Sequence, residues 1–359
     1  METNNVSKLV TGLAAYRRRR YFSIAGLLAL LLIVIGVACS VGTAHVSLAE
    51  VWRLLLSKLP GINIDNGISS TLYKIVIDVR LPRILLAGLA GAALSTAGAT
   101  YQGVFRNPLA DPYLLGVAQA SSLGAVIGFM FFSSQSAGIS CIPLIALCGG
   151  ITCIVVLYLL ARVGKTLPTT TVILAGVVLG AIFTALISFL LWKFASESHG
   201  MGIVFWLMGT CSSAKWLDVY VLFPYLILGL IPIYLYSRPL NLMQLDEGQA
   251  QQLGVNVEKV KLILLFSASL LTAAAVSFTG CIGFIGIIIP HAVRLIWGPD
   301  YRFLLPLSTI VGAIFLILTD TLCRTVAGGG AEMPVGIITA FVGAPFFLYL
   351  LRQRKQVSF

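Results

Sequence analysis

Three arginines lie beside apolar stretches of the chain, where a charged side chain is costly. Arg80 and Arg83 precede one apolar run, and Arg324 follows another, four residues after Asp320. A guanidinium presents a planar fork of donors that can bind a carboxylate through two parallel hydrogen bonds. These arginines are therefore candidates for pairing with acidic groups. The alternative is that they extend to lipid headgroups at a membrane interface.

Residues that could support catalysis or ion coupling are sparse. His291 stands beside Pro290 at the end of an apolar run, and no H-E-x-x-H or G-x-S-x-G pattern occurs. Ion-coupled carriers place carboxylates or histidines deep in their spans. The acidic residues nearest to apolar runs are all close to run ends: Asp111, Asp300, Asp320 and Glu332. The pattern argues against an intramembrane enzyme and against an ion-coupled secondary transporter.

The sequence from Arg162 to Thr166 contains the Gly-Lys-Thr of a phosphate-binding loop. The full motif needs a glycine five residues before Gly164, and Leu159 occupies that position. We therefore expect no ATP hydrolysis and no bound cofactor in this chain. The spacing of Cys141, Cys148 and Cys153 also indicates no metal site.

Residues 238–261 form a compact polar stretch between two apolar runs. The stretch reads RPLNLMQLDEGQAQQLGVNVEKVK, and Gly254 stands where a glycine cap would end a helix that begins near Asp246. Two short helices joined at a bend fit this pattern. An ordinary solvated loop fits it equally well on the residues alone.

The composition requires a membrane. Of 359 residues, 58% are hydrophobic and 10% are charged, whereas soluble domains carry roughly 25% charged residues. A helix needs about 20 apolar residues to cross a bilayer core. We expect an all-α polytopic protein with about ten transmembrane helices, at 21–41, 84–104, 113–132, 139–161, 170–193, 216–236, 261–279, 282–297, 304–325 and 334–351. The third span and the seventh–eighth pair are candidates for broken helices.

Charge placement orients these spans. With ten spans, 16 of the 24 Lys and Arg residues fall on the side of the two termini and 8 on the other, which is the bias of cytoplasmic loops. We therefore predict a basic cytoplasmic segment 1–20, a membrane domain 21–351 and a cytoplasmic tail 352–359. The net charge of +11 is explained by this bias and does not indicate nucleic acid. The first apolar run is too long for a signal peptide and is read as a retained helix.

The longest predicted external segment, 42–79, includes an amphipathic stretch. Leu48, Val51 and Leu55 recur at helical spacing, and Ser47 with Glu50 forms a potential capping box. A short helix on the membrane surface is expected.

Three motifs carry a family resemblance. They are RLPRILLAGLAGAALSTAGATYQGVFRNPLADPYLLG from Arg80, TGCIGFIGIIIPHAVRL from Thr279, and PVGIITAFVGAPFF near the C-terminus. In this order they resemble the permease family for iron-chelate, haem and cobalamin uptake by ABC importers, the FecCD type, from about Leu48 to Leu351. The resemblance implies the type II permease fold of these importers.

The resemblance also implies working parts. Arg80, Arg83 and Arg324 would receive acidic residues of a substrate-binding protein, and Asn107 with Leu109 would form a cytoplasmic gate. Segment 238–261 would dock into a separate ATPase, which binds ATP and Mg²⁺. The residues expected to make this coupling contact are Asp246, Glu247, Ala250, Leu253 and Gly254.

The expected function is that of the permease subunit of a binding-protein-dependent ABC importer. It would act as a homodimer in the inner (plasma) membrane, with the pore on the two-fold axis. The expected cargo is a metal chelate, ferric siderophore or haem first, cobalamin second and an oxyanion such as molybdate third. Residues 119–122 read Gln-Ala-Ser-Ser, where the resembled family more often has a serine-glycine-alanine string. This segment therefore does not identify the cargo.

Overall fold

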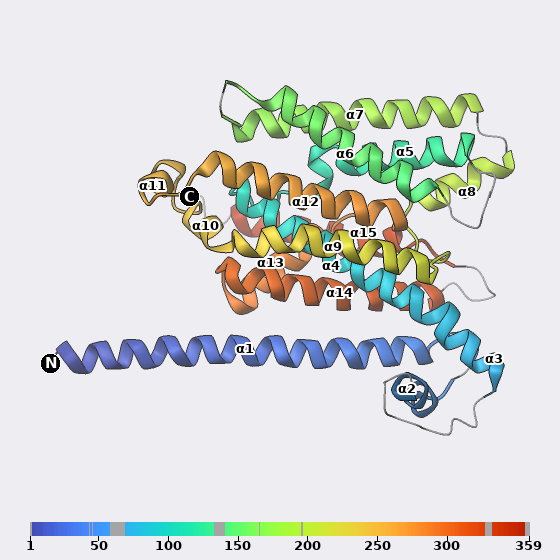
Figure 1. The fold of residues 1–359 in the computed structure, drawn as a ribbon, viewed down its shortest axis with the longest axis horizontal. Helices are drawn as coiled ribbons and strands as arrows, with labels where there is room; N and C mark the ends of the chain where they lie inside the picture. Colours follow the sequence, from blue (N-terminus) through green and yellow to red (C-terminus); the bar gives the residue numbers. More distant parts are fainter. Residues whose placement is uncertain are drawn as a thin grey trace.

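The computed structural model describes residues 2–42, 44, 46–57, 69–132, 141–164, 166–194, 197–326 and 332–355. These residues form helices and their connections, with one isolated bridge between Val163 and Thr166. Figure 1 shows long helices lying nearly parallel, with α10, α11 and both termini at one end. We call this the basal end. The opposite end, which carries α2, α3 and α8, is the distal end.

The helices follow one another in the order α1 (Glu2–Ser40), α2 (Leu48–Ser57), α3 (Ser70–Tyr73), the π-helix Lys74–Arg80, α4 (Leu81–Val104), the 3₁₀-helix Pro112–Leu115, α5 (Val117–Phe131), α6 (Ile142–Ala161), α7 (Thr169–Phe194), α8 (Glu197–Leu207), α9 (Trp216–Leu235), α10 (Ser237–Leu242), α11 (Glu247–Gln252), α12 (Val257–Thr279), α13 (Ile285–Trp297), α14 (Tyr301–Val326) and α15 (Val335–Lys355).

Each of the ten predicted spans overlaps one helix. In the described part of the chain, six helices are long and apolar enough to cross a membrane, and three shorter apolar helices, α5, α13 and residues 335–349 of α15, lie among them. The remaining predicted span is α4, whose 24 residues are nearly all buried inside the bundle. The expected all-α class with about ten spans is confirmed.

The third and eighth spans are shorter than predicted. The third begins only at Val117, because a 3₁₀-helix and Gly116 in the left-handed region (φ 75°) precede it. The eighth begins at Ile285, after Phe284 with φ 69°. The resulting helices have 15 and 13 residues, and their irregular ends lie within the protein, where backbone groups can find partners.

The distal segment contains both an expected and an unexpected element. The capping box is confirmed, since the Glu50 amide donates to Ser47 Oγ at 3.2 Å and the Ser47 amide donates to Glu50 Oε2 at 2.8 Å. The π-helix Lys74–Arg80, which runs directly into α4, was not predicted. Residues 58–68 and 327–331 of the predicted external loops, Lys165, and residues 356–359 of the tail lie outside the described residues.

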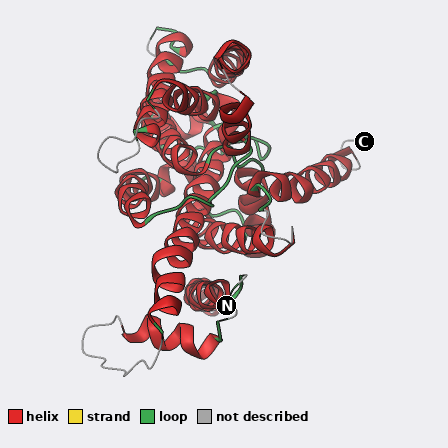
Figure 2. Cartoon of the chain, turned by 90° about the vertical axis from the view of Figure 1, so that its right-hand side faces the viewer, coloured by secondary structure: helices red, strands yellow, loops and turns green. Residues whose placement is uncertain are grey.

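Small residues let α4 sit at the centre of the bundle. A Cβ on Gly98 would lie 2.1 Å from the Gly286 carbonyl oxygen, so α4 and α13 touch through backbone. Gly176 packs in the same way on the turn before α5. Figure 2 shows the bundle nearly end-on, with the C-terminal helix standing away from the rest. That helix exposes Phe341 and Leu348, and α7 exposes a similar apolar face.

Candidate functional site

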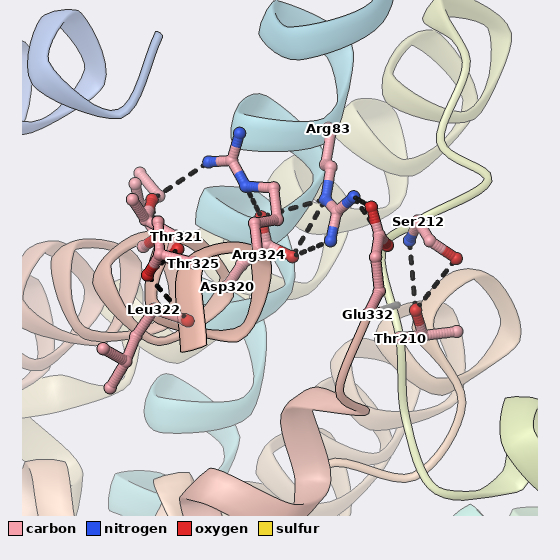
Figure 3. A network of polar contacts seen from close by, with 10 residues as sticks. Arg83, Thr210, Ser212, Asp320, Thr321, Leu322, Arg324, Thr325 and Glu332 are labelled. Carbon is pink, nitrogen blue, oxygen red and sulfur yellow. Dashed lines mark hydrogen bonds and ion pairs between the residues drawn. The ribbon is translucent and has the colours of Figure 1, made fainter. Parts of the chain in front are cut away.

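A cluster of four charged residues joins α4, α14 and the segment before α15 at the distal end. Figure 3 shows Arg83 between two carboxylates. Its Nε donates to both oxygens of Asp320 at 3.0 Å, and its Nη1 donates to both oxygens of Glu332 at 2.8 and 2.9 Å. Arg324 lies on the other side of Asp320, with Nε 3.3 Å from Oδ2. Two guanidinium groups and two carboxylates make the cluster formally neutral.

Burial differs sharply within this cluster. The side chain of Asp320 is 1% exposed, and those of Arg83 and Arg324 are 8% exposed. Glu332 is 37% exposed and is the outward-facing member of the four. Charges taken out of water to this degree are tolerated only when paired and hydrogen-bonded.

Arg80 has a different set of partners. Its guanidinium donates to the carbonyl oxygens of Cys39 at 2.7 Å, Ser40 at 3.2 Å and Ala44 at 2.7 Å. Its donors thereby satisfy carbonyl groups at the C-terminal end of α1, which have no partners within their own helix. The three arginines predicted to dock a binding protein thus lie at the distal end, but their guanidinium groups are bonded within this chain. Their docking role stays a prediction.

The basal end carries the predicted pair of short helices, α10 and α11. Asp246 caps α11 by accepting from the Gly248 amide at 3.2 Å. The helix ends in a Schellman motif, in which Gly254 has φ 86° and the Val255 amide donates to the Ala250 carbonyl. Leu253 is exposed, whereas Ala250 is fully buried. Ala250 therefore supports the helix from within and offers no surface to a partner.

Arg106, which follows the end of α4, connects these helices to α4. Arg106 lies 3.1 Å from Asp246 Oδ1 and 3.7 Å from Glu247 Oε1. The hydrogen bond from Arg106, followed by backbone amide donors, lowers the pKa of Asp246, so this carboxylate stays ionised at neutral pH. Arg106 itself has φ 50°, an uncommon conformation for arginine.

A second set of contacts ties α11 to its neighbours. Lys261, buried at the start of α12, donates to Glu247 Oε2 at 2.8 Å and lies 3.8 Å from Glu258. Glu258 accepts from the Leu167 amide at 2.7 Å. The chain of contacts therefore runs from the α6–α7 connection through α12 to α11, and from α11 to Arg106.

The predicted gate residues follow Arg106 directly. Asn107 Oδ1 accepts from the Leu109 amide at 3.0 Å, and the Asn107 carbonyl accepts from the Ala110 amide at 3.0 Å. This closed turn fixes Asn107 and Leu109 at the basal end of α4, one residue from the ion pair with α11. Within the described ranges, no group of three or more His, Cys, Asp or Glu residues could hold a metal ion.

Comparison with known proteins identifies this arrangement. The model of the FecCD transport family matches residues 29–353, nearly the whole chain. The chain belongs to the FecCD transport family. Relatives of this FecCD chain include the cobalamin import system permease protein BtuC of Halobacterium salinarum, which is 43% identical over 80% of this chain and 76% of that protein. The hemin transport system permease protein HmuU of Yersinia pestis is 35% identical over 93% of this chain and 96% of that protein.

A solved structure agrees with the fold. An inward-facing conformation, assigned to a metal-chelate type ABC transporter, matches with a TM-score of 0.78 at 32% identity, over 92% of this chain and 98% of that one. The FecCD chain is therefore a multi-pass permease of the ABC importer class. The family and the general function expected from the three motifs are confirmed.

Proposed function

We propose that this FecCD chain moves a metal chelate, a ferric siderophore or haem, across the inner membrane with energy from ATP hydrolysed by a separate subunit. The family match over residues 29–353 carries the proposal. Haem and cobalamin, the cargoes named for two relatives, are both metal ions held in organic macrocycles. A large chelate is the cargo class that these relatives share.

The basal end would face the cytoplasm and receive the ATPase. Both termini and most Lys and Arg residues belong to this side, as the positive-inside bias requires. Exposed Leu253 and the rigid cap at Gly254 would dock α11, and Glu247 and Asp246 would hold α11 to Arg106. Motion of the ATPase would then be transmitted through the salt bridge of Arg106 to the turn at Asn107 and Leu109, which we call the gate turn.

The distal end would receive the substrate-binding protein. Arg83 is the strongest candidate, because one of its two partners, Glu332, is accessible from outside. Acidic residues of the binding protein would displace Glu332 from Arg83, while Asp320 stays in place. Arg324, through Asp320, and Arg80, through the end of α1, would hold the helices that carry this surface in place. Two copies of the chain, packed through the exposed apolar faces of α7 and α15, would double it about a two-fold axis.

Cobalamin is the second candidate cargo. The 43% identity with the BtuC protein of Halobacterium salinarum is the observation that favours it. Molybdate-type oxyanions are a third possibility.

Uptake with a defined ATPase and binding protein tests the proposal. The chain would be reconstituted in vesicles with its partner ATPase. A substrate-binding protein carrying ferric siderophore, haem or cobalamin would be added at the distal side of the chain. We expect ATP-dependent uptake of an iron chelate and none without the ATPase. Uptake of cobalamin alone would select the second candidate. ATP-independent uptake driven by an ion gradient would refute the importer mechanism.

A further inference from the structure

A cavity at the basal end lies between α1, α10 and the start of α14, outside both charged clusters. It has a volume of about 280 Å³ and is lined by Tyr21, Ile24, Arg238, Arg302, Phe303 and Pro306. A single water needs roughly 10–15 Å³ by such a measure. The cavity is therefore large enough for a ligand.

Its lining changes from cationic to apolar along the helices. Arg238 is the second residue of α10, which follows span α9, and Arg302 is the second residue of α14. Ile24 and Pro306 lie one turn further into α1 and α14. Figure 1 shows α10 and α14 reaching the basal end of the bundle, with α1 running alongside. Cationic groups thus lie at the level of the membrane interface, with apolar groups below them.

The surroundings are electropositive. Arg20, buried behind the cavity, contacts Asp300 at 3.3 Å and lies over the ring of Phe303 at 4.7 Å. Asp300 also binds Arg302 at 2.7 Å. Burial would raise the pKa of Asp300, but hydrogen bonds from Arg302 and Asn241 lower it to about 2, so Asp300 is ionised.

The four charged residues of this group carry a net positive charge. Arg20, Arg302 and Arg238 supply three positive charges against the one negative charge of Asp300, which leaves two. Among the described residues, no carboxylate lies within ion-pair distance of Arg238, which is exposed at the rim. Tyr21, whose ring packs against Phe303 at 5.6 Å between centroids, is the kind of aromatic residue found at headgroup level.

We propose that this cavity binds an anionic membrane phospholipid, with its phosphate at Arg238 and Arg302 and the start of an acyl chain against Ile24, Phe303 and Pro306. Basic pockets between transmembrane helices suit such headgroups. A free phosphate ion would use the arginines but gain nothing from the apolar floor. The proposal requires only that the chain spans a membrane, and it does not depend on the cargo.

Lipid binding to the purified protein tests the site. Native mass spectrometry of the detergent-solubilised protein would titrate phosphatidylglycerol, phosphatidylcholine and inorganic phosphate separately. We expect preferential retention of phosphatidylglycerol. Arg238→Gln should weaken that retention about fivefold, since one basic group near a membrane surface contributes about 1 kcal/mol. Ile24→Trp, which fills the apolar floor, should weaken it as well.

The matched control is Arg162→Gln. Arg162 is an exposed arginine on the same end of the bundle and is outside the cavity. It should leave phosphatidylglycerol retention unchanged. Equal losses in the Arg162 and Arg238 variants would show a general charge effect and overturn the site. Equal retention of both lipids would overturn it too, and so would displacement of phosphatidylglycerol by inorganic phosphate alone.

Discussion

The two ends of α4 carry charged clusters of similar composition and opposite character. At the distal end, Arg83 and Asp320 are almost completely withdrawn from water. At the basal end, the side chains of Arg106 and Asp246 are 39% and 57% exposed. Exposed ion pairs contribute about 0–1 kcal/mol to stability, whereas breaking a buried pair costs about 3–5 kcal/mol.

This difference in exposure indicates two different roles: the distal cluster holds helices together, and the basal pair transmits motion. The buried core of the distal cluster, Arg83 with Asp320, fixes α4 to α14, because breaking this pair would strand a charge away from water. An exposed pair costs little to break and reform, which suits a contact that must follow a moving partner. We therefore expect distal substitutions to affect stability first and basal substitutions to affect coupling first.

The largest effect is expected from Asp320→Ala. The substitution would leave Arg83 with Glu332 alone and Arg324 without a carboxylate, both in a buried setting. We predict a loss of about 3–5 kcal/mol, the usual cost of a stranded buried charge. Thermal unfolding of the purified protein measures it. The matched control is Asp78→Ala, an exposed acidic residue of the distal π-helix Lys74–Arg80. An unchanged unfolding temperature for Asp320→Ala would contradict the holding role.

The second effect concerns the docking surface of α11. Leu253→Glu places a charge on an exposed apolar residue and should reduce ATP-driven uptake tenfold or more, because interface hot spots contribute about 2 kcal/mol or more. The unfolding temperature should not change. Val163→Glu, an equally exposed residue at the basal end outside α11, is the control and should keep normal uptake. Normal uptake and normal ATPase binding in the Leu253 variant would exclude α11 as the coupling element.

The third effect is smaller and tests the salt link itself. Arg106→Asp or Asp246→Arg should each lower uptake relative to ATP hydrolysed. Stability should change by about 1 kcal/mol or less for Arg106→Asp, as for other exposed pairs. Asp246→Arg should cost a further loss of about 0.5–2 kcal/mol, because it also removes the N-cap of α11. The two substitutions together exchange the partners and should restore much of the ratio. If the double variant is as poorly coupled as the sum of the single ones, the link between α11 and the gate turn does not transmit.

Sequence patterns predicted the parts of this molecule that depend on local chemistry. The apolar runs predicted the spans, Ser47 and Glu50 predicted a capping box, and Asp246 with Gly254 predicted both ends of α11. The turn at Asn107 lies at the end of α4, as predicted, and its role as a gate stays a prediction. Each of these features is determined within a few neighbouring residues.

What the sequence left open depends on contacts across the chain. Arg83 is 237 residues from Asp320, and nothing local indicates that the two would pair rather than meet a partner. Helix α13 begins only after Phe284 in the left-handed region, and its Gly286 packs against the backbone of α4, which no periodicity records. Arg106 had no motif of its own, although its place between a span and the Asn-Pro turn was a signal that could have been used.

The smallest effect decides whether Arg83 also docks a partner. Arg83→Glu would reverse a buried charge, so lost docking could not be told from lost structure. Glu332→Gln is the sharper variant, because it weakens only the accessible pair and leaves Asp320 bonded to Arg83. If binding-protein carboxylates compete with Glu332, the neutral amide competes less. The binding-protein concentration for half-maximal ATPase stimulation should then fall about two- to fivefold, the scale of an exposed ion pair of about 0.5–1 kcal/mol.

Raised salt should reduce the difference between the variant and the parent protein, because exposed charges are screened over about 8 Å at physiological ionic strength. A lower unfolding temperature with the same half-maximal concentration would assign Glu332 and Arg83 to structure alone.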